Sequence, residues 1–238
     1  EDGLDWPGLE DAMARFTVAM SEVGYPPCPG GVMVSRPHWR LSATQWRARL
    51  DQWRSHYDPQ AAMDLSITLD ARPVAGNAAL FAPLEAQMQA LGGDERLLHA
   101  MAVAVLQFES PLSFFGQLRQ GERGLDIKRG GIFPVVHGLR CLALKPGITQ
   151  RSSFPRCDAL VACGGLDAPL ARDLAQALAV LQRLRLDAQL AALDAGGVPD
   201  NLLHPDTLRR LDRELLRDAL RVVKAFRQQV RSAFHLSD

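Results

Sequence analysis

Apolar residues recur at helical spacing along most of the chain, and this pattern sets the expected order of its elements. Near the start, Leu9, Met13, Phe16 and Met20 recur every three or four residues and predict a first helix over residues 8–23. From residue 77 onward the spacing is helical nearly throughout. It predicts helices over residues 78–91, 94–109, 131–145, 156–163, 168–194 and 205–235.

A further helix is predicted directly after Ser42, a residue type favoured at the N-cap. In the following stretch, ATQWRARLDQWRSHY, the side chains of Trp46, Leu50 and Trp53 share one face. The leucine stripe of the predicted helix 168–194 is typical of the core of a helical bundle rather than of a cofactor site.

One segment departs from helical spacing. In MDLSITLDARPVAG, residues 63–76, three apolar residues alternate with polar ones. Such alternation predicts a half-buried β-strand whose polar side ends in Asp70 and Arg72, and the stretch VMVS predicts another short strand. We therefore expect a mainly α fold with a small α/β part, in which a bundle of helices follows the strands.

Composition excludes several classes of protein. The 238 residues include 27 Lys and Arg and 27 Asp and Glu, so the balanced charge gives no general attraction to nucleic acid or to a membrane surface. No apolar run approaches the length of about 20 residues that a membrane-spanning helix needs. The four cysteines form no CxxC pair, which favours reduced thiols and a cytoplasmic protein.

Asp70 is the first candidate for chemistry. A carboxylate at the end of a strand has the geometry of a metal ligand, and Arg72 beside it could bind a phosphate group through two hydrogen bonds. The alternative is a strand on the surface whose charges form an ordinary salt bridge.

Two further segments carry groups suited to anions. Lys128 precedes Gly130 and Gly131 at the start of a predicted helix, where free backbone N–H groups could bind a phosphate. An ordinary helix-initiating loop is the alternative. Arg40 follows a Pro-rich loop that could contact a nucleotide, or that Trp39 could simply pack against the protein. His137, one turn before Arg140 in sequence, is typical of a core histidine, with a catalytic role as the alternative.

The segments GYPPCPGGVMVSRPHWRLSATQWRARLDQW, SITLDARPVAG and LDIKRGGIFPVVHGLRCLALKPGIT resemble nucleotidyltransferases of the DUF294 type, which are related to the uridylyltransferase of the nitrogen-signalling protein PII. The resemblance continues in LQRLRLDAQL and GGVPDNLLHPDTL, and so covers nearly the whole chain. It implies that residues 1–80 are the C-terminal part of a nucleotidyltransferase palm and that residues 81–238 form a C-terminal helical bundle. It also implies upstream CBS and cyclic-nucleotide-binding domains and a role in signal transduction.

The resemblance assigns roles to the candidate residues. Asp70 matches the third acidic residue of the family's catalytic set, which implies that it helps to hold Mg²⁺. Arg72 would steady a phosphate or the neighbouring carboxylates, and the loop with Lys128 would contact the nucleotide or the palm. Where the family has a Thr-x-x-Arg helix start, Ser153 and Arg156 stand in the matching places.

The chain departs from the family in its first catalytic motifs. It contains no Gly-Ser motif followed by an Asp-x-Asp motif, and in the family these would lie just upstream of Glu1. We therefore expect a piece of a longer protein that is inactive by itself.

Two functions from different classes follow. The first is Mg²⁺-dependent transfer of UMP or AMP from a nucleoside triphosphate to a protein or small-molecule acceptor. The second is a non-catalytic regulatory module with a vestigial palm, whose helical bundle binds a partner or forms a homodimer. A polymerase-like transferase acting on nucleic acid is a third reading, and the balanced charge argues against it.

Overall fold

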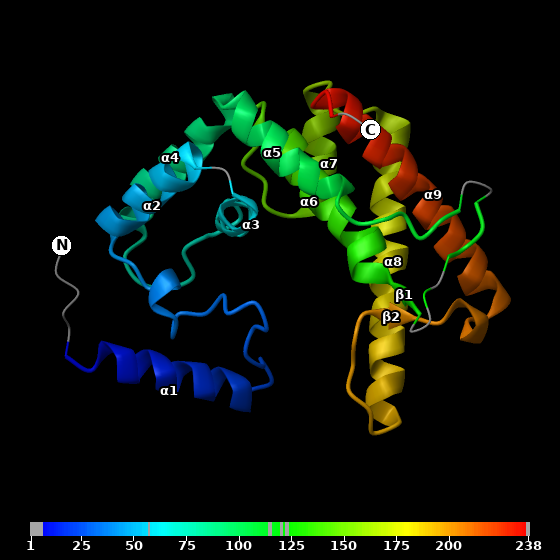
Figure 1. The fold of residues 1–238 in the computed structure, drawn as a ribbon, viewed down its shortest axis with the longest axis horizontal. Coiled ribbons are helices and arrows are strands. Elements are labelled where there is room, and N and C mark those ends of the chain that lie inside the picture. The colour runs from blue at the N-terminus through cyan, green and yellow to red at the C-terminus, as the bar shows by residue number, and fades with distance from the viewer. Residues whose placement is uncertain (1–6, 57, 114–115, 120, 122–123, 237–238) are drawn as a thin grey trace. The chain divides into compact units, whose positions relative to one another are not determined.

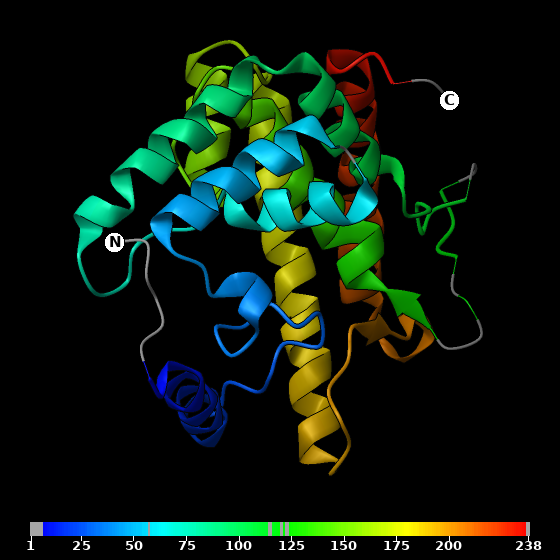
Figure 2. The same cartoon turned by 60° about the vertical axis from the view of Figure 1, so that its left-hand side comes forward.

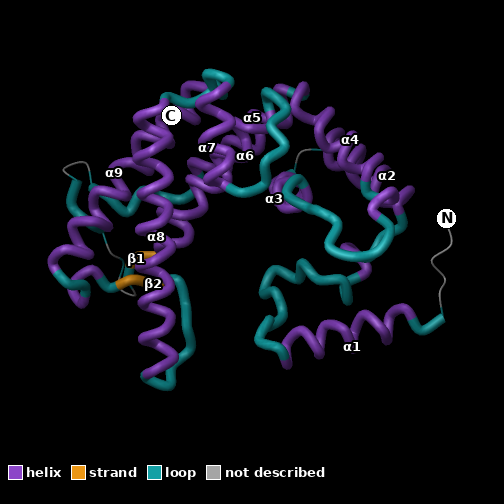
Figure 3. The backbone as a smooth tube through the Cα atoms, turned by 180° about the vertical axis from the view of Figure 1, so that it is seen from behind, coloured by secondary structure: helices purple, strands orange, loops and turns teal. Residues whose placement is uncertain are grey.

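The computed structural model describes residues 7–56, 58–113, 116–119, 121 and 124–236. Helices make up most of this part of the chain (Figure 3). The α-helices, labelled in Figure 1, are α1 (Leu9–Glu22), α2 (Ala43–Ser55), α3 (Pro59–Thr68), α4 (Ala82–Ala90), α5 (Glu95–Leu106), α6 (Phe133–Leu144), α7 (Ser153–Ala162), α8 (Ala168–Asp194) and α9 (Arg210–Ala233). The shorter elements are η1 (Pro37–Trp39), η2 (Ala78–Leu80), η3 (Leu91–Gly93), β1 (Leu125–Asp126), the π-helical turn η4 (Lys128–Ile132), β2 (Leu202–Leu203) and η5 (Pro205–Thr207).

The chain forms two compact units, each built from two stretches of sequence. Unit 1 comprises residues 1–56 and 71–88, and unit 2 comprises residues 57–70 and 89–238. The segment that carries α3 therefore belongs to unit 2, although residues of unit 1 precede and follow it.

Unit 1 contains α1, α2 and most of α4. The predicted N-cap of α2 is confirmed: Ser42 Oγ accepts a hydrogen bond from the backbone N–H of Gln45 at 3.1 Å, and the Gln45 side chain accepts one from the Ser42 N–H at 2.8 Å. This capping box satisfies two N–H groups at the start of the helix. The ring centroids of Trp39, Trp46 and Trp53 lie 6.1 to 6.4 Å apart, so these rings pack α2 against η1.

The core of unit 2 lies between α8 and α9, which run side by side in opposite directions (Figures 1 and 2). Helix α8 spans the residues that the sequence predicted, and Asp167 caps its first turn through the Leu170 N–H. Apolar residues three or four apart face inward on both helices. The buried ones include Leu174, Leu178, Leu181 and Leu184 on α8, and Leu216, Leu220, Val223, Phe226 and Val230 on α9.

Helix α6 approaches α9 closely because it carries glycine at the contact. A Cβ placed on Gly138 would lie 2.6 Å from the ring of Phe226 and 3.1 Å from Val230. Any larger residue would push the helices apart, so the glycine sets their separation at this point.

The strand predicted over the segment 63–70 is wrong, because these residues belong to the helix α3 and the turn after it. The start signal is Asp58, whose carboxylate accepts a hydrogen bond from the Ala61 N–H at 2.7 Å, followed by a proline in the first turn. The alternating apolar residues do not share one environment, since Leu65 is fully buried and Ile67 is 38% exposed. The strand predicted at VMVS is also wrong, because Val32 has no regular structure and the next three residues form a bend and a turn.

A two-stranded sheet occurs elsewhere, in unit 2. Strands β1 and β2 pair antiparallel, with Leu125 opposite Leu203 and Asp126 opposite Leu202. A mainly α fold with a small α/β part is therefore confirmed, although its strands lie elsewhere than predicted. None of the helices in the described chain combines the length and the apolar character needed to cross a membrane.

Candidate functional site

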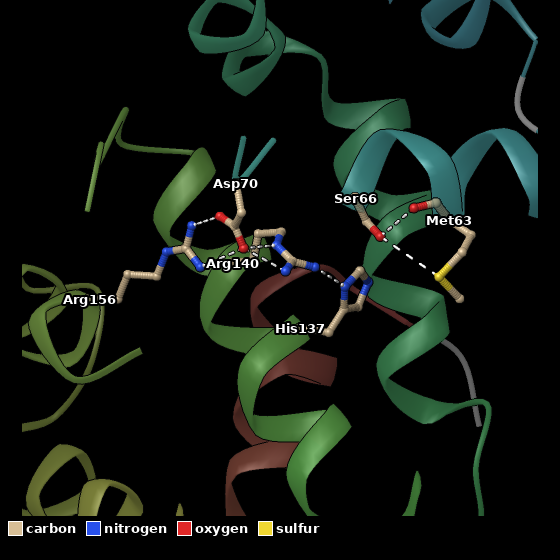
Figure 4. A network of polar contacts seen from close by, with 6 residues as sticks. All are labelled: Met63, Ser66, Asp70, His137, Arg140 and Arg156. Carbon is tan, nitrogen blue, oxygen red and sulfur yellow. Dashed lines mark hydrogen bonds and ion pairs between the residues drawn. The ribbon is translucent and has the colours of Figure 1, made fainter. Parts of the chain in front are cut away.

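Asp70 lies at the centre of a charged network within unit 2, shown in Figure 4. It follows Leu69, the C-cap of α3, and its carboxylate points at two arginines from other helices. Arg140 of α6 donates to Oδ2 of Asp70 from Nε at 2.8 Å and from Nη2 at 2.5 Å. Arg156 of α7 donates to Oδ1 from Nη2 and to Oδ2 from Nη1 at 3.4 Å. Both carboxylate oxygens therefore accept from guanidinium groups.

The three charged side chains are largely withdrawn from water. The exposed fraction of the side chain is 22% for Asp70, 14% for Arg140 and 5% for Arg156. Burial by itself raises the pKa of Asp70, but hydrogen bonds and positive charge from the two arginines outweigh it and lower the pKa. The carboxylate is thus ionised at neutral pH.

His137 extends this network into the protein interior. Its ring stacks on Phe133, with centroids 5.1 Å apart and an angle of 11° between the planes. Nε2 lies 2.8 Å from the carbonyl oxygen of Met101, and Nδ1 lies 3.2 Å from Nη1 of Arg140. Because a carbonyl only accepts and a guanidinium only donates, these partners assign the proton to Nε2. Burial, followed by the charge of Arg140, lowers the pKa of His137 to about 4, so the ring is neutral at pH 7.

A cavity of about 330 Å³ opens beside His137. Helix α3 contributes Ala62, Met63 and Ser66 to its wall, and α5 contributes Met101 and Ala104. Ser66 donates its hydroxyl proton to the Met63 carbonyl oxygen at 2.8 Å, which leaves lone pairs on its oxygen. The wall is mostly apolar with few polar groups, which is typical of a site for a small molecule or a single side chain.

The other predicted site residues do not gather around Asp70 as one group. Arg40 and Arg72 belong to unit 1, where Arg72 is exposed and Nη1 of Arg40 is buried without a hydrogen-bond partner among the described residues. Lys128 is exposed on the π-helical turn η4 of unit 2. Their roles in binding a substrate stay predictions.

Gly130 and Gly131 have a packing reason to be glycine. A Cβ on Gly130 would lie 2.9 Å from the ring of Pro111, and a Cβ on Gly131 would lie 3.1 Å from Leu181. Both are buried inside unit 2. The close contacts explain the glycines without a bound anion, so a phosphate site at these residues also stays a prediction.

The contacts at Asp70 do not fit a magnesium ligand. Mg²⁺ needs carboxylate oxygens with free lone pairs and a surplus of negative charge, whereas Asp70 already faces two positive groups. The described residues also include no group of three or more His, Cys, Asp or Glu placed to hold a metal ion. We therefore derive no catalytic step through a metal at Asp70, and its catalytic and metal-binding roles stay predictions that these contacts do not favour.

Sequence reasoning missed the partners of Asp70. Arg140 and Arg156 lie 70 and 86 residues further along the chain, so no local pattern connects them to Asp70. A signal for Arg140 was present, since it lies three residues after His137 on a predicted helix and such residues are neighbours. Only the family resemblance indicates a role for Arg156.

Two family models match the chain. Residues 95–234 match the model described as "Putative nucleotidyltransferase substrate binding domain", and residues 1–60 match the model described as "Putative nucleotidyltransferase DUF294". Asp70 lies between the two matched ranges, whereas Arg140, Arg156 and His137 lie within the first. No curated protein and no solved structure matches the chain.

Proposed function

The chain belongs to the DUF294 family of nucleotidyltransferases, and from this premise we propose that it binds the acceptor substrate of a Mg²⁺-dependent transfer of UMP or AMP from a nucleoside triphosphate. The acceptor is a small molecule or a side chain of a protein. The proposal includes a cytoplasmic location and regulation by CBS and cyclic-nucleotide-binding domains upstream, as the family resemblance implies.

One observation carries the proposal. The range that matches the substrate-binding model contains α5 and His137, which form much of the wall of the 330 Å³ cavity. This volume lies at the lower end of the usual range for small-molecule sites. We assign the cavity to the apolar part of the acceptor, with the neutral ring of His137 and the Ser66 hydroxyl at its wall.

The proposal places the Mg²⁺ site away from Asp70. Nucleotidyl transfer develops negative charge on the α-phosphate and on the leaving pyrophosphate, and bound Mg²⁺ offsets that charge. Since the described residues do not fit a Mg²⁺ site at Asp70, we assign the metal to the Gly-Ser and Asp-x-Asp motifs of the family. The residues of this chain would position the acceptor and exclude water from it.

A regulatory module is the second candidate function, and one observation favours it. Asp70, the residue that resembles a catalytic acid, forms ion pairs with Arg140 and Arg156 as a structural residue would. In that case the bundle would bind a partner or a second copy of the chain without turnover.

The test uses the gene product that contains these 238 residues, with Mg²⁺, α-labelled UTP or ATP, and a PII-like protein or a cell extract as acceptor. In the variant Ala104→Phe a ring fills the cavity, and we expect KM for the acceptor to rise at least about five-fold while nucleotide binding is unchanged. Val198→Phe is the matched control, because Val198 is 89% exposed and lies outside the cavity wall. Label transfer that is insensitive to Ala104→Phe would remove the cavity from the proposal. An absence of both nucleotide binding and transfer would favour the regulatory module.

A further inference from the structure

We propose that Arg140 and Arg156 form a binding site for a phosphate dianion, such as a phosphate monoester or a polyphosphate, and that Asp70 fills this site as an internal competitor. The site goes beyond acceptor binding in the cavity. It depends on contacts within unit 2 alone, and it stands even if the chain takes no part in nucleotidyl transfer.

The charges at this site do not balance. Two guanidinium groups face one carboxylate, which leaves one positive charge in a largely buried position. Two neighbouring titratable groups, His137 and Cys141, do not offset it: His137 is neutral, and burial raises the pKa of the Cys141 thiol to about 12, so Cys141 stays protonated. One arginine would be enough to form an ion pair with Asp70. The second arginine adds the positive charge that is needed to bind an anion with two negative charges.

Arg140 has a hydrogen-bond partner besides Asp70, and the protein encloses the side chain of Arg156. Arg140 also donates from Nη1 to His137, whose ring is fixed by Met101 and by stacking on Phe133. Arg156 lies in the first turn of α7 with only 5% of its side chain exposed. Guanidinium groups that are ordered in advance lose little entropy when they bind the oxygens of a phosphate in pairs.

Arg156 keeps a donor that Asp70 does not satisfy. Its Nε is buried and has no hydrogen-bond partner among the described residues. A carboxylate has two oxygens, and both already accept from the arginines. A phosphate has a third terminal oxygen, so it could satisfy a further N–H group where the carboxylate cannot.

Asp70 is the member of the network that can leave most easily. It lies in the turn after α3, and its N–H makes a long hydrogen bond of 3.3 Å to the Ile67 carbonyl oxygen. The next residue begins a stretch that belongs to unit 1 and has no regular structure until η2. The arginines, by contrast, project from the helices α6 and α7 (Figure 4).

Because Asp70 is attached to the same chain as the two arginines, only some ligands can compete with it. A side chain attached close to its site acts at an effective concentration in the millimolar range or above. A free carboxylate with one charge gains nothing over Asp70 and would rarely displace it. A phosphate dianion interacts with both arginines through twice the charge, which is why we assign the site to phosphates.

The experiment measures binding of inorganic phosphate and of pyrophosphate by calorimetry at constant ionic strength, with acetate as a monoanion control. We expect Asp70→Asn to raise the affinity for pyrophosphate about ten-fold, because it removes the tethered competitor but keeps the size of the side chain. Adding Arg156→Gln to that variant should abolish the gain. The ratio of the affinity for inorganic phosphate to the affinity for pyrophosphate then distinguishes a monoester site from a polyphosphate site.

The matched control is Asp218→Asn, which makes the same change in net charge at an exposed ion pair with Arg221 on α9. An equal rise in that variant would show that the effect is general charge, and would overturn the proposal. So would an affinity that Asp70→Asn leaves unchanged. If Asp70→Asn does not fold, the wild-type protein still gives an answer, because pyrophosphate should shift the side-chain Nε–Hε NMR signals of Arg140 and Arg156. Signals that stay in place at saturating pyrophosphate would refute the site.

Discussion

The neutral, buried ring of His137 makes the stability of unit 2 sensitive to mildly acidic pH. Burial, followed by the charge of Arg140, lowers the pKa of His137 from 6.5 to about 4 in the folded protein. As pH falls below 6.5 the unfolded chain takes up a proton that the folded chain does not. The folded state therefore loses stability until pH falls to the lowered pKa near 4.

The size of the effect follows from the two pKa values. At pH 5 the unfolded histidine is almost fully protonated and the folded one is about 10% protonated, so the loss relative to pH 7 is about 2 kcal/mol. Below pH 4 the loss levels off at about 3 kcal/mol. Asp70 contributes little between pH 7 and pH 5, because a carboxylate with a lowered pKa loses its stabilising effect mainly as pH falls toward and below its unfolded value of 3.8.

The assay is urea unfolding followed by far-UV circular dichroism at pH 7, 6 and 5. The variant His137→Gln keeps a donor for the Met101 carbonyl oxygen but cannot titrate, so its free energy of unfolding should fall by about 2 kcal/mol less between pH 7 and pH 5. His204→Gln, at an exposed position, makes the same change without removing a buried ring and should behave like the wild type. Equal pH dependence in wild type and His137→Gln, or an NMR titration of His137 near pH 6.5, would refute the reasoning.

Three further predictions concern packing and capping. Phe226→Ala removes a fully buried ring between α9 and α6 and should lower the free energy of unfolding, measured with urea, by about 3–5 kcal/mol; a loss below 1 kcal/mol would contradict the described core. Gly92→Ala places a Cβ 2.2 Å from the Leu144 carbonyl oxygen and should cost about 1–3 kcal/mol in the same assay, whereas Gly93→Ala meets no atom within 4 Å and should change little. Ser42→Ala removes the capping box of α2 and should destabilise unit 1 by about 1 kcal/mol, measured by tryptophan fluorescence because the four tryptophans all precede residue 54; an unchanged midpoint would count against the cap.

Long helices with clear caps could be predicted from the sequence, as α8 shows. Its leucines recur every three or four residues over 27 positions, and Asp167 followed by a proline marks its start. The short helix α3 could not be predicted in the same way, because three apolar residues fit an alternating pattern and a helical one about equally well. Asp58 is the N-cap of this helix, but an aspartate before a proline is equally typical of a turn, so it does not predict a helix by itself.

The candidate site could be predicted only in part, since its contacts join residues far apart in sequence. The sequence predicts Asp70 as a catalytic and metal-binding residue, and these roles stay predictions. Its ion pairs with Arg140 and Arg156 could not be predicted from any local pattern. Strands β1 and β2 could not be predicted either, because each has only two residues. Their pairing places Leu125 opposite Leu203, which lies far along the sequence. Strands this short have no local sequence pattern, and contacts made in the folded protein determine where they form.

The interleaved order of the two units has a consequence for folding during synthesis. Unit 1 has all of its residues once residue 88 has been made, whereas Asp70 must wait 86 residues for Arg156. At about 5–20 residues per second, this delay lasts roughly 4–17 s on the ribosome. Asp70 is thus expected to remain without its arginine partners after unit 1 has all of its residues. The order of folding then differs from the order of synthesis, with residues 71–88 reaching their final structure before residues 57–70.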